Sequence, residues 1–386
     1  METLSAAVAE RIAAIESDLH AHPERSFQER RTTALIEREL VALGFAIIDL
    51  GLETGVVARF DTGKRGRTVG LRADIDAICQ LEAVDRPDRS TIPGVMHACG
   101  HDVHASALLG AAMLLSENKA ALSGDVVLIF QPAEEILAGS RALISHGLFE
   151  KAPLDVLFGL HNLPALPVGT AGVKEGPLMS GKDDFTLTVH GRGGHGGMPH
   201  KCVDPIVAAA AIVSALQTVV SRSIDPFDSA VVSVCSIHGG TPENLVVDTV
   251  TMTGSVRTLS PGARTTALKR IREIAQNTAD AYGCTVELDF EEKALAVTNS
   301  PDMTMFARAA AIEAVGRENV LSPSPVLASE DFSFYGERVP SFFYFLGSGL
   351  PDVENAAWHS ANFHAAPGTA ECGARLYYES VIAAQE

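Results

Sequence analysis

Short apolar runs recur along the first 160 residues, and each of them stops where polar side chains begin. The runs cover 68–71, 126–130 and 156–160, and helical stretches such as 105–115 alternate with them. Strands that alternate with helices form a largely parallel sheet covered by helices on both faces. The sequence therefore predicts an α/β domain.

The polar side chains that follow these runs carry most of the chemistry of the chain. They are Arg72, Asp74 and Asp76 after the first run, Gln131, Glu134 and Glu135 after the second, and His161 and Asn162 after the third. Open α/β sheets place their sites at the carboxyl ends of their strands. We therefore expect a functional site at this edge of the sheet.

The pattern changes near Gly181. Strand-like alternation at 184–190, 230–237, 246–257 and 285–290 is interrupted by helical stretches at 205–220 and 263–282. This order is β-α-β-β-α-β, the split βαβ arrangement of ferredoxin-like domains. The later segments, helical at 302–315 and 373–384 and apolar at 342–346, return to the first pattern. We predict a first domain of residues 1–180 and 292–386, with an inserted α+β domain of residues 181–291.

A helix near the start of the chain has its own boundary signals. Ser26-Phe27-Gln28-Glu29 matches a capping box, and the apolar series that follows stops at Gly44. A Ser with a Glu three residues later caps a helix through reciprocal hydrogen bonds to the backbone. We therefore predict a helix that begins at this motif.

Composition excludes several classes of function. The chain has 386 residues, 46% of them apolar, which is enough to form the cores of two domains. Its net charge of -18 disfavours binding to nucleic acid or to anionic membranes. Residues 1–19 have neither a signal-peptide core nor a spanning segment, and the six cysteines have no paired spacing. We expect a cytoplasmic protein with reduced thiols.

Two short segments combine the donor groups that bind divalent metals. Cys99 and His101 lie on either side of Gly100, where both side chains can face one point. Thiolate and imidazole suit zinc, and also manganese, nickel or cobalt when carboxylates share the site. The alternative is a buried cysteine beside a histidine that caps a helix.

The adjacent carboxylates Glu134 and Glu135 favour the interpretation as a metal site. They lie in the otherwise uncharged stretch 126–138. Burying them unpaired costs several kcal/mol, so a nearby cation is expected. The alternative is a solvated loop.

Ordered motifs along nearly the whole chain resemble the M20 metallopeptidase and amidohydrolase family, in particular the branch of hippurate hydrolases and plant auxin-conjugate hydrolases. The motifs occupy 70–77, 93–104, 131–135, 159–163, 193–196 and 329–333. The resemblance implies metal-dependent hydrolysis of the amide bond of N-acyl amino acids. Where this branch has Ala-Leu-Pro, the chain has Ala77-Ile78-Cys79, a change that alters the adjoining loop.

The same resemblance implies a paired metal site. Its five predicted ligands are Cys99, His101, Glu135, His161 and His359. Five ligands exceed one tetrahedral shell, so we expect two divalent ions per subunit, whether manganese, zinc, nickel or cobalt. Glu134 is the implied general base.

Further residues around the ligands have supporting roles. Asp76 and Asp102 are expected to lie behind the ligands, with Asp76 orienting a ligating imidazole through its other nitrogen. His104 is likewise placed outside the ligand set.

The glycine-rich segment 191–196 allows two interpretations. It matches a dinucleotide-binding fingerprint, but no helix follows directly and no acidic residue stands at the required distance. We favour the alternative, in which the glycines let His195 donate a hydrogen bond to the developing oxyanion. The resemblance implies that residues 1–180 and 292–386 form the metal-binding catalytic domain and that residues 181–291 form a lid or dimerisation domain. His195 would then reach the site from this lid or from a partner subunit of a homodimer or homotetramer. Asn244 and Arg257 are candidates for binding a substrate carboxylate, although Arg257 could equally form an internal salt bridge.

Two other functions fit parts of this pattern. A dipeptidase would use the same metal site, but it would need an acidic group for the free α-amine of its substrate. A catalytically silent binding protein for a metal or an amino acid is the second alternative, since a fold does not prove a function. The presence of Glu134 argues against the silent protein.

Overall fold

A computed structural model of the chain describes residues 4–240 and 243–386. The chain divides into two compact units. The first unit consists of Met1–Gly176, Thr298–Ser324 and Asp331–Glu386, and the second of Pro177–Val297 and Pro325–Glu330. The second unit begins before residue 181 and ends after residue 291, the bounds of the predicted inserted domain, and it also includes Pro325–Glu330.

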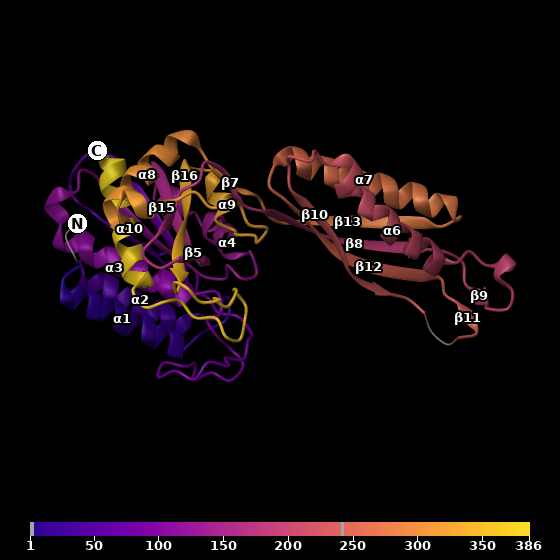
Figure 1. The fold of residues 1–386 in the computed structure, drawn as a ribbon, viewed down its shortest axis with the longest axis horizontal. Helices are drawn as coiled ribbons and strands as arrows, with labels where there is room; N and C mark the ends of the chain where they lie inside the picture. The colour runs from indigo at the N-terminus through magenta and orange to yellow at the C-terminus, as the bar shows by residue number, and fades with distance from the viewer. Residues whose placement is uncertain (1–3, 241–242) are drawn as a thin grey trace. The chain divides into compact units, whose positions relative to one another are not determined.

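The first unit is an α/β structure built on one eight-stranded sheet (Figure 1). Its strands, in the spatial order of the sheet, are β1 (Ala46–Ile47), β2 (Val56–Phe60), β4 (Val126–Gln131), β3 (Val69–Asp74), β5 (Val156–Pro167), β16 (Ser341–Gly349), β6 (Ala171–Gly172) and β15 (Val320–Leu321). The four central strands β4, β3, β5 and β16 are parallel, and their residues are almost all buried. Such strands are apolar throughout because both faces of the sheet are covered. The predicted mostly parallel sheet is confirmed.

Helices surround this sheet. They are α1 (Ala6–Ala21), α2 (Arg30–Ala42), α3 (His101–Glu117), α4 (Gly139–Ser145), α5 (Leu148–Lys151), α8 (Pro301–Val315), α9 (Ser333–Gly336) and α10 (Thr369–Gln385), with 3-10 turns at Lys119–Ala121 and Arg317–Asn319. Figure 1 shows α3 and α10 on one side of β5 and β16, and α4 and α9 on the other. Helix α3 is buried along nearly its whole length, so its first residues are held firmly at the end of the sheet.

The start of α2 corrects the predicted capping box. The N-cap residue is Glu29, and its side chain makes no cap hydrogen bond. Instead, the Glu24 carboxylate accepts from the backbone N–H groups of Arg31 and Thr32, at 3.1 and 2.8 Å. Ser26 and Glu29 are therefore available for contacts elsewhere in the fold.

The second unit is a four-stranded antiparallel sheet with two helices. The elements follow the chain order β8 (Gly181–His190), β9 (Gly194–His195), a 3-10 turn (Pro199–Lys201), α6 (Pro205–Ser223), β10 (Ala230–His238), β11 (Leu245–Val246), β12 (Thr249–Thr258), α7 (Pro261–Ala281) and β13 (Thr285–Ala294). The sheet order is β10-β12-β8-β13, and β9 pairs with β11 in a separate short ladder. The order of the main elements is the predicted β-α-β-β-α-β. Strands β7 (Gly176–Met179) and β14 (Val297–Asn299) lie where the chain passes between the units.

Within the described residues, one helix, α6, has the length and apolar composition of a membrane span, with a mean hydropathy of 1.5. Its buried side chains include Ala209, Ile212 and Leu216, which belong to the core of the second unit. This packing buries one side of α6, whereas Ile206, Val207 and Val220 of the same helix are exposed.

Candidate metal centre

The five predicted ligands come from separate parts of the first unit. Cys99 precedes α3, His101 opens it, Glu135 follows β4, His161 lies in β5, and His359 lies in the loop before α10. Their donor atoms gather in overlapping groups, Cys99 with His101 and His161, Cys99 with Glu135 and His359, and His101 with Glu134 and Glu135. Within each group all donor atoms lie within 4.8 Å of one another. The structure therefore brings all five predicted ligands and Glu134 together.

The turn between Cys99 and His101 depends on Gly100. Its φ is 82°, the left-handed region, and a Cβ there would lie 2.5 Å from Asn162 Nδ2. Only glycine adopts such a conformation without strain and leaves this space open. Gly100 thus allows the thiol and the imidazole to face one side of the turn.

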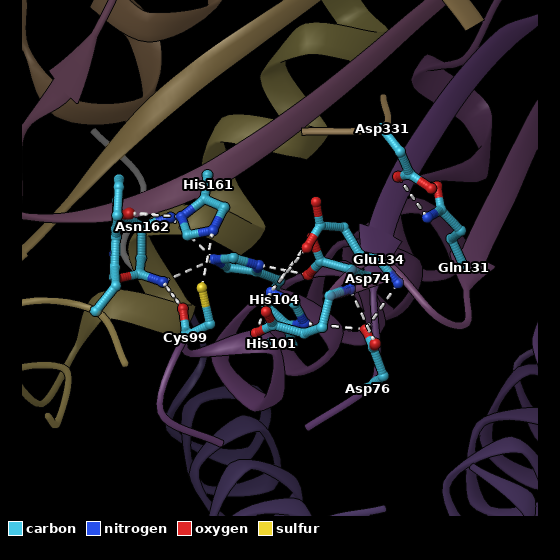
Figure 2. Close-up of polar contacts among 12 residues, drawn as sticks. Asp74, Asp76, Cys99, His101, His104, Gln131, Glu134, His161, Asn162 and Asp331 are labelled. Carbon is cyan, nitrogen blue, oxygen red and sulfur yellow. Dashed lines mark hydrogen bonds and ion pairs between the residues drawn. The ribbon is translucent and has the colours of Figure 1, made fainter. Parts of the chain in front are cut away.

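Cys99 and His161 have the geometry of two ligands of one ion. Cys99 Sγ lies 3.4 Å from His161 Nε2, and His161 Nδ1 bonds the backbone oxygen of Asn162 at 2.8 Å (Figure 2). Bonds of about 2.3 Å to sulfur and about 2.0 Å to nitrogen separate two tetrahedral ligand atoms by about 3.5 Å. Because Nδ1 is the donor, Nε2 presents its lone pair beside the thiol. Burial, with the neighbouring His104, holds the pKa of His161 well below its usual value, so the ring is neutral, the form that binds metals.

Asp76, which we expected to orient a ligating imidazole, lies beside His101. Asp76 Oδ1 lies 3.2 Å from His101 Nδ1 (Figure 2). His101 Nε2 faces the carboxylates of Glu134 and Glu135, each at 3.9 Å. In the described part of the chain, the buried atoms His101 Nε2 and Glu135 Oε1 have no hydrogen-bond partner. Burial lowers the pKa of His101, but Asp74, Asp76 and Glu135 together raise it to about 10. A carboxylate set that stabilises an imidazolium in this way also stabilises a divalent cation.

Glu134 and Glu135 are not in a solvated loop. Glu134 is 5% exposed, and the Glu135 side chain is 9% exposed. Their backbone N–H groups donate to Asp76 Oδ1 and Oδ2, each at 3.1 Å. Glu135 Oε2 lies 3.2 Å from His359 Nε2. The Asp76 carboxylate therefore positions both the His101 ring and the turn that carries the two glutamates.

His104 and Asp102 lie outside the ligand set. His104 Nδ1 lies 2.6 Å from Asp74 Oδ1, and its Nε2 accepts from the backbone N–H of Asn162 at 2.9 Å, so both ring nitrogens are engaged. Asp102 was expected to stand behind the ligands, but its carboxylate instead bonds His20 Nδ1 at 2.6 Å. It makes no hydrogen bond with a predicted ligand in the described residues.

Sequence reasoning missed several residues that hold the site. Ser26 Oγ donates to Asp76 Oδ2 at 2.6 Å, and the buried Glu29 Oε1 accepts from the Ala133 N–H at 2.9 Å. Ala133 has a positive φ of 55°. Burial, with the neighbouring Asp76, raises the pKa of Glu29 to about 7. The Ser26-x-x-Glu29 pattern therefore supports the metal-site turn instead of capping a helix.

A second network lies behind Asp74. The fully buried Arg72 donates to Asp74 Oδ2 at 2.8 Å, to Asp331 Oδ1 at 3.1 Å and to Gln131 Oε1 at 2.9 Å. Figure 2 shows Asp331 and Gln131 beside the metal-site residues. Because Arg72 and His104 engage the Asp74 carboxylate, direct ligation by Asp74 is disfavoured.

The second unit holds the remaining predicted residues. His195 pairs with Leu245 across the β9–β11 ladder, and the Gly196 N–H donates to the Asn244 oxygen at 2.8 Å, so His195 and Asn244 are neighbours. The Gly197 N–H donates to His195 Nδ1 at 3.0 Å, which places the proton of a neutral ring on Nε2. His195 is exposed, and its Nε2–H is a hydrogen-bond donor.

Arg257 does not form the internal salt bridge that was the alternative interpretation. Its NH1 donates to the Leu327 oxygen at 3.0 Å and to Ser329 Oγ at 2.8 Å, and both partners are neutral. No carboxylate lies within ion-pair distance of it in residues 4–240 and 243–386. Its positive charge is therefore not neutralised within the second unit.

Comparisons with known proteins agree with the motifs. The family model of peptidase family M20/M25/M40 matches residues 70–383. An N-acetylcysteine deacetylase of Bacillus subtilis (strain 168) is 41% identical over 355 residues, 92% of this chain and 91% of the relative. An IAA-amino acid hydrolase of Arabidopsis thaliana is 38% identical over 333 residues, 85% of this chain and 75% of the relative.

A solved structure extends the likeness to the metal chemistry. A dinuclear metal-binding peptidase of the M20 family from Bacillus subtilis has a TM-score of 0.86 and 35% identity, and each chain covers 98% of the other. In this chain, the predicted ligands form overlapping groups, each of which could hold a metal ion. The chain belongs to peptidase family M20/M25/M40.

Proposed function

We propose that the chain hydrolyses the amide bond of N-acyl amino acids and releases a carboxylate and a free amino acid. The convergence of Cys99, His101, Glu135, His161 and His359 on one site, with a buried glutamate beside them, carries this proposal. The relatives that act on N-acetylcysteine and on IAA-amino acids support the substrate class.

Metal identity and ligand assignment are part of the proposal. Cys99, His101, Glu135, His161 and His359 would hold two divalent ions, and a thiolate with imidazoles and a carboxylate suits zinc, manganese, nickel or cobalt. When bound, such ions acidify a water molecule and polarise a carbonyl oxygen. The residues of the chain supply the proton transfers.

Glu134 is proposed as the general base and acid. Its neighbours His101 and Glu135 belong to the ligand set, so its carboxylate lies beside the position where water would be activated. Glu134 takes a proton from the water that attacks the amide carbonyl and returns it to the leaving nitrogen. The amine then departs as a free amino acid.

The second unit is proposed to contribute to substrate binding. His195 would donate its Nε2–H to the oxyanion that develops on the carbonyl, from the same chain or from a partner subunit. Asn244 and Arg257 would bind the carboxylate of the substrate, Arg257 through a charge that no acidic residue neutralises among the residues that the structure describes. Residues 181–291 would thus act as a lid and dimerisation domain of a cytoplasmic homodimer or homotetramer.

Peptide hydrolysis is the second candidate, because the structurally similar Bacillus subtilis protein is described as a peptidase. A dipeptidase would recognise the free α-amine of its substrate. The two candidates therefore differ in whether acylation of that amine is needed for cleavage.

The test is release of free amino acid from N-acetyl, N-benzoyl and indole-acetyl amino acids and from unmodified dipeptides. Protein loaded with manganese or zinc is compared with the same protein after chelation. Cleavage of the acylated compounds that is lost on chelation is expected. Cleavage of dipeptides alone would assign the peptidase function, and no cleavage by metal-loaded protein would contradict both.

A further inference from the structure

His20, near the end of α1, is a buried imidazole between two carboxylates. It is 3% exposed, with Nδ1 at 2.6 Å from Asp102 Oδ2 and Nε2 at 3.2 Å from Glu82 Oε1. Ionised carboxylates only accept hydrogen bonds, so both ring nitrogens must donate. Two ionised carboxylates at these distances therefore favour an imidazolium.

Each of the two carboxylates belongs to a different part of the metal site. Asp102 directly follows His101 in the first turn of α3. Glu82 lies in the loop after Asp76, and its Oε2 accepts from the Ser90 N–H at 2.7 Å, which folds this loop back on itself. His20 thus joins the start of α3 to the loop.

The same loop contacts the backbone of His359. Gln80 Nε2 donates to the His359 oxygen at 2.7 Å, and the Ala83 N–H donates to the Ala361 oxygen at 2.8 Å. His359 has a positive φ of 61°. A residue other than glycine holds this conformation only where its surroundings fix it. The loop of residues 80–83 provides part of that fixation.

The opposite charges of His20 and its two carboxylate partners, Asp102 and Glu82, stabilise this connection. Burial alone would lower the pKa of His20, and Arg86 acts in the same direction, but Asp102 and Glu82 raise it to about 9. Removal of the imidazolium would leave the Asp102 and Glu82 carboxylates buried without their shared cation. Such uncompensated charges destabilise the segments that carry them.

We propose that His20 is a positioning residue of the metal site, which couples the first turn of α3, with His101, to the loop 80–83 that fixes the backbone of His359. This inference rests on the proposed ligand set. It assigns His20 no contact with metal or substrate, only the alignment of two ligands that are far apart in the sequence.

The test compares His20→Gln with His22→Gln, a matched change of the half-exposed histidine two residues further on, which contacts Asp18. Affinity for zinc or manganese alone is measured by competition with a chelator, and hydrogen exchange is followed in residues 355–366. His20→Gln is expected to weaken the weaker of the two metal sites about 10–100-fold, the range for residues that orient ligands. Exchange in 355–366 is expected to rise, and activity to recover when metal is in excess.

A lower melting temperature for His20→Gln with unchanged metal affinity and unchanged exchange in 355–366 would overturn the proposal, since this is the result of a purely structural ion pair. If His20→Gln does not fold, Glu82→Gln removes only one end of the connection and is expected to weaken metal binding in the same direction. Unchanged metal affinity in that variant would also overturn it. Metal affinity and hydrogen exchange can be measured without any substrate. Wild-type protein that binds metal but cleaves no substrate would therefore contradict the proposed function and leave this inference standing.

Discussion

Asp76 Oδ1 lies 3.2 Å from His101 Nδ1, while the backbone N–H groups of Glu134 and Glu135 donate to the same carboxylate. One side chain therefore fixes a proposed ligand ring, a second proposed ligand and the proposed general base. Because Asp76 closely follows the end of β3, the rigid sheet sets the position of all three.

Replacement of Asp76 should impair metal binding before it impairs the fold. We expect Asp76→Ala to lower the affinity for zinc or manganese about 10–100-fold, because the His101 ring loses its orienting acceptor. Chelator competition measures this change. Asp225→Ala, which alters an exposed loop carboxylate of the second unit, is the control. Equal metal affinity in the two variants would show that Asp76 does not orient the ligand.

Gly100 should tolerate no side chain. A Cβ at this position would lie 2.5 Å from Asn162 Nδ2, and its φ is 82°. Gly63 has a φ of 72°, but a Cβ there would meet no atom within 4 Å, so it separates backbone strain from the steric contact. We expect Gly63→Ala to lower the free energy of unfolding by about 1 kcal/mol and Gly100→Ala to lower it by clearly more, in urea denaturation. Equal losses would mean that the contact with Asn162 relaxes freely.

Replacement of His195 should lower the turnover number and leave metal binding unchanged. Loss of an oxyanion donor lowers kcat about 10²–10³-fold in enzymes that use one. We expect a decrease of this size for His195→Ala, with unchanged metal content. His190→Ala, in the same unit, is the control and should keep its activity. A change in KM with kcat unaffected would instead assign His195 to substrate binding.

Stability should depend on pH through His20. Its pKa is raised from 6.5 to about 9 in the folded protein, so its contribution is fully present below pH 6.5 and is lost as the pH rises through 9. This difference corresponds to about 3 kcal/mol. The difference in free energy of unfolding between metal-loaded wild-type protein and His20→Gln should therefore decrease by about this amount as the pH rises from 6 to 10. Parallel stability curves for the two proteins would contradict a charged His20.

The sheet could be predicted because its signals are local, whereas the proposed ligand set was inferred from motifs that resemble those of a known family. Continuous apolar runs mark β3, β4 and β5, and the proposed ligands stand near the ends of these strands or within short motifs. The period of two likewise reflects one buried face in β8 and one partly buried face in β13. Such patterns arise from burial within one element, so they are visible without the fold.

The supporting contacts could not be predicted in this way. Ser26 meets Asp76 across 50 residues, Glu29 meets Ala133 across 104, and His20 meets Asp102 across 82. The Ser26-x-x-Glu29 spacing matched a capping box, but both side chains form tertiary hydrogen bonds instead of capping a helix. The placement of Pro325–Glu330 with the second unit also depends on the fold alone, because no change of pattern marks this segment.

The most direct test of the account is the combined metal content and turnover of Glu134→Gln. This change keeps the size of the side chain and removes its ability to take a proton, while all five proposed ligands remain. We predict two bound metal ions per chain, as in the wild type, and a loss of kcat of about 10²-fold or more on N-acyl amino acids. Full turnover by the metal-loaded variant would contradict the central claim that Glu134 is the base of a metal-dependent amide hydrolase.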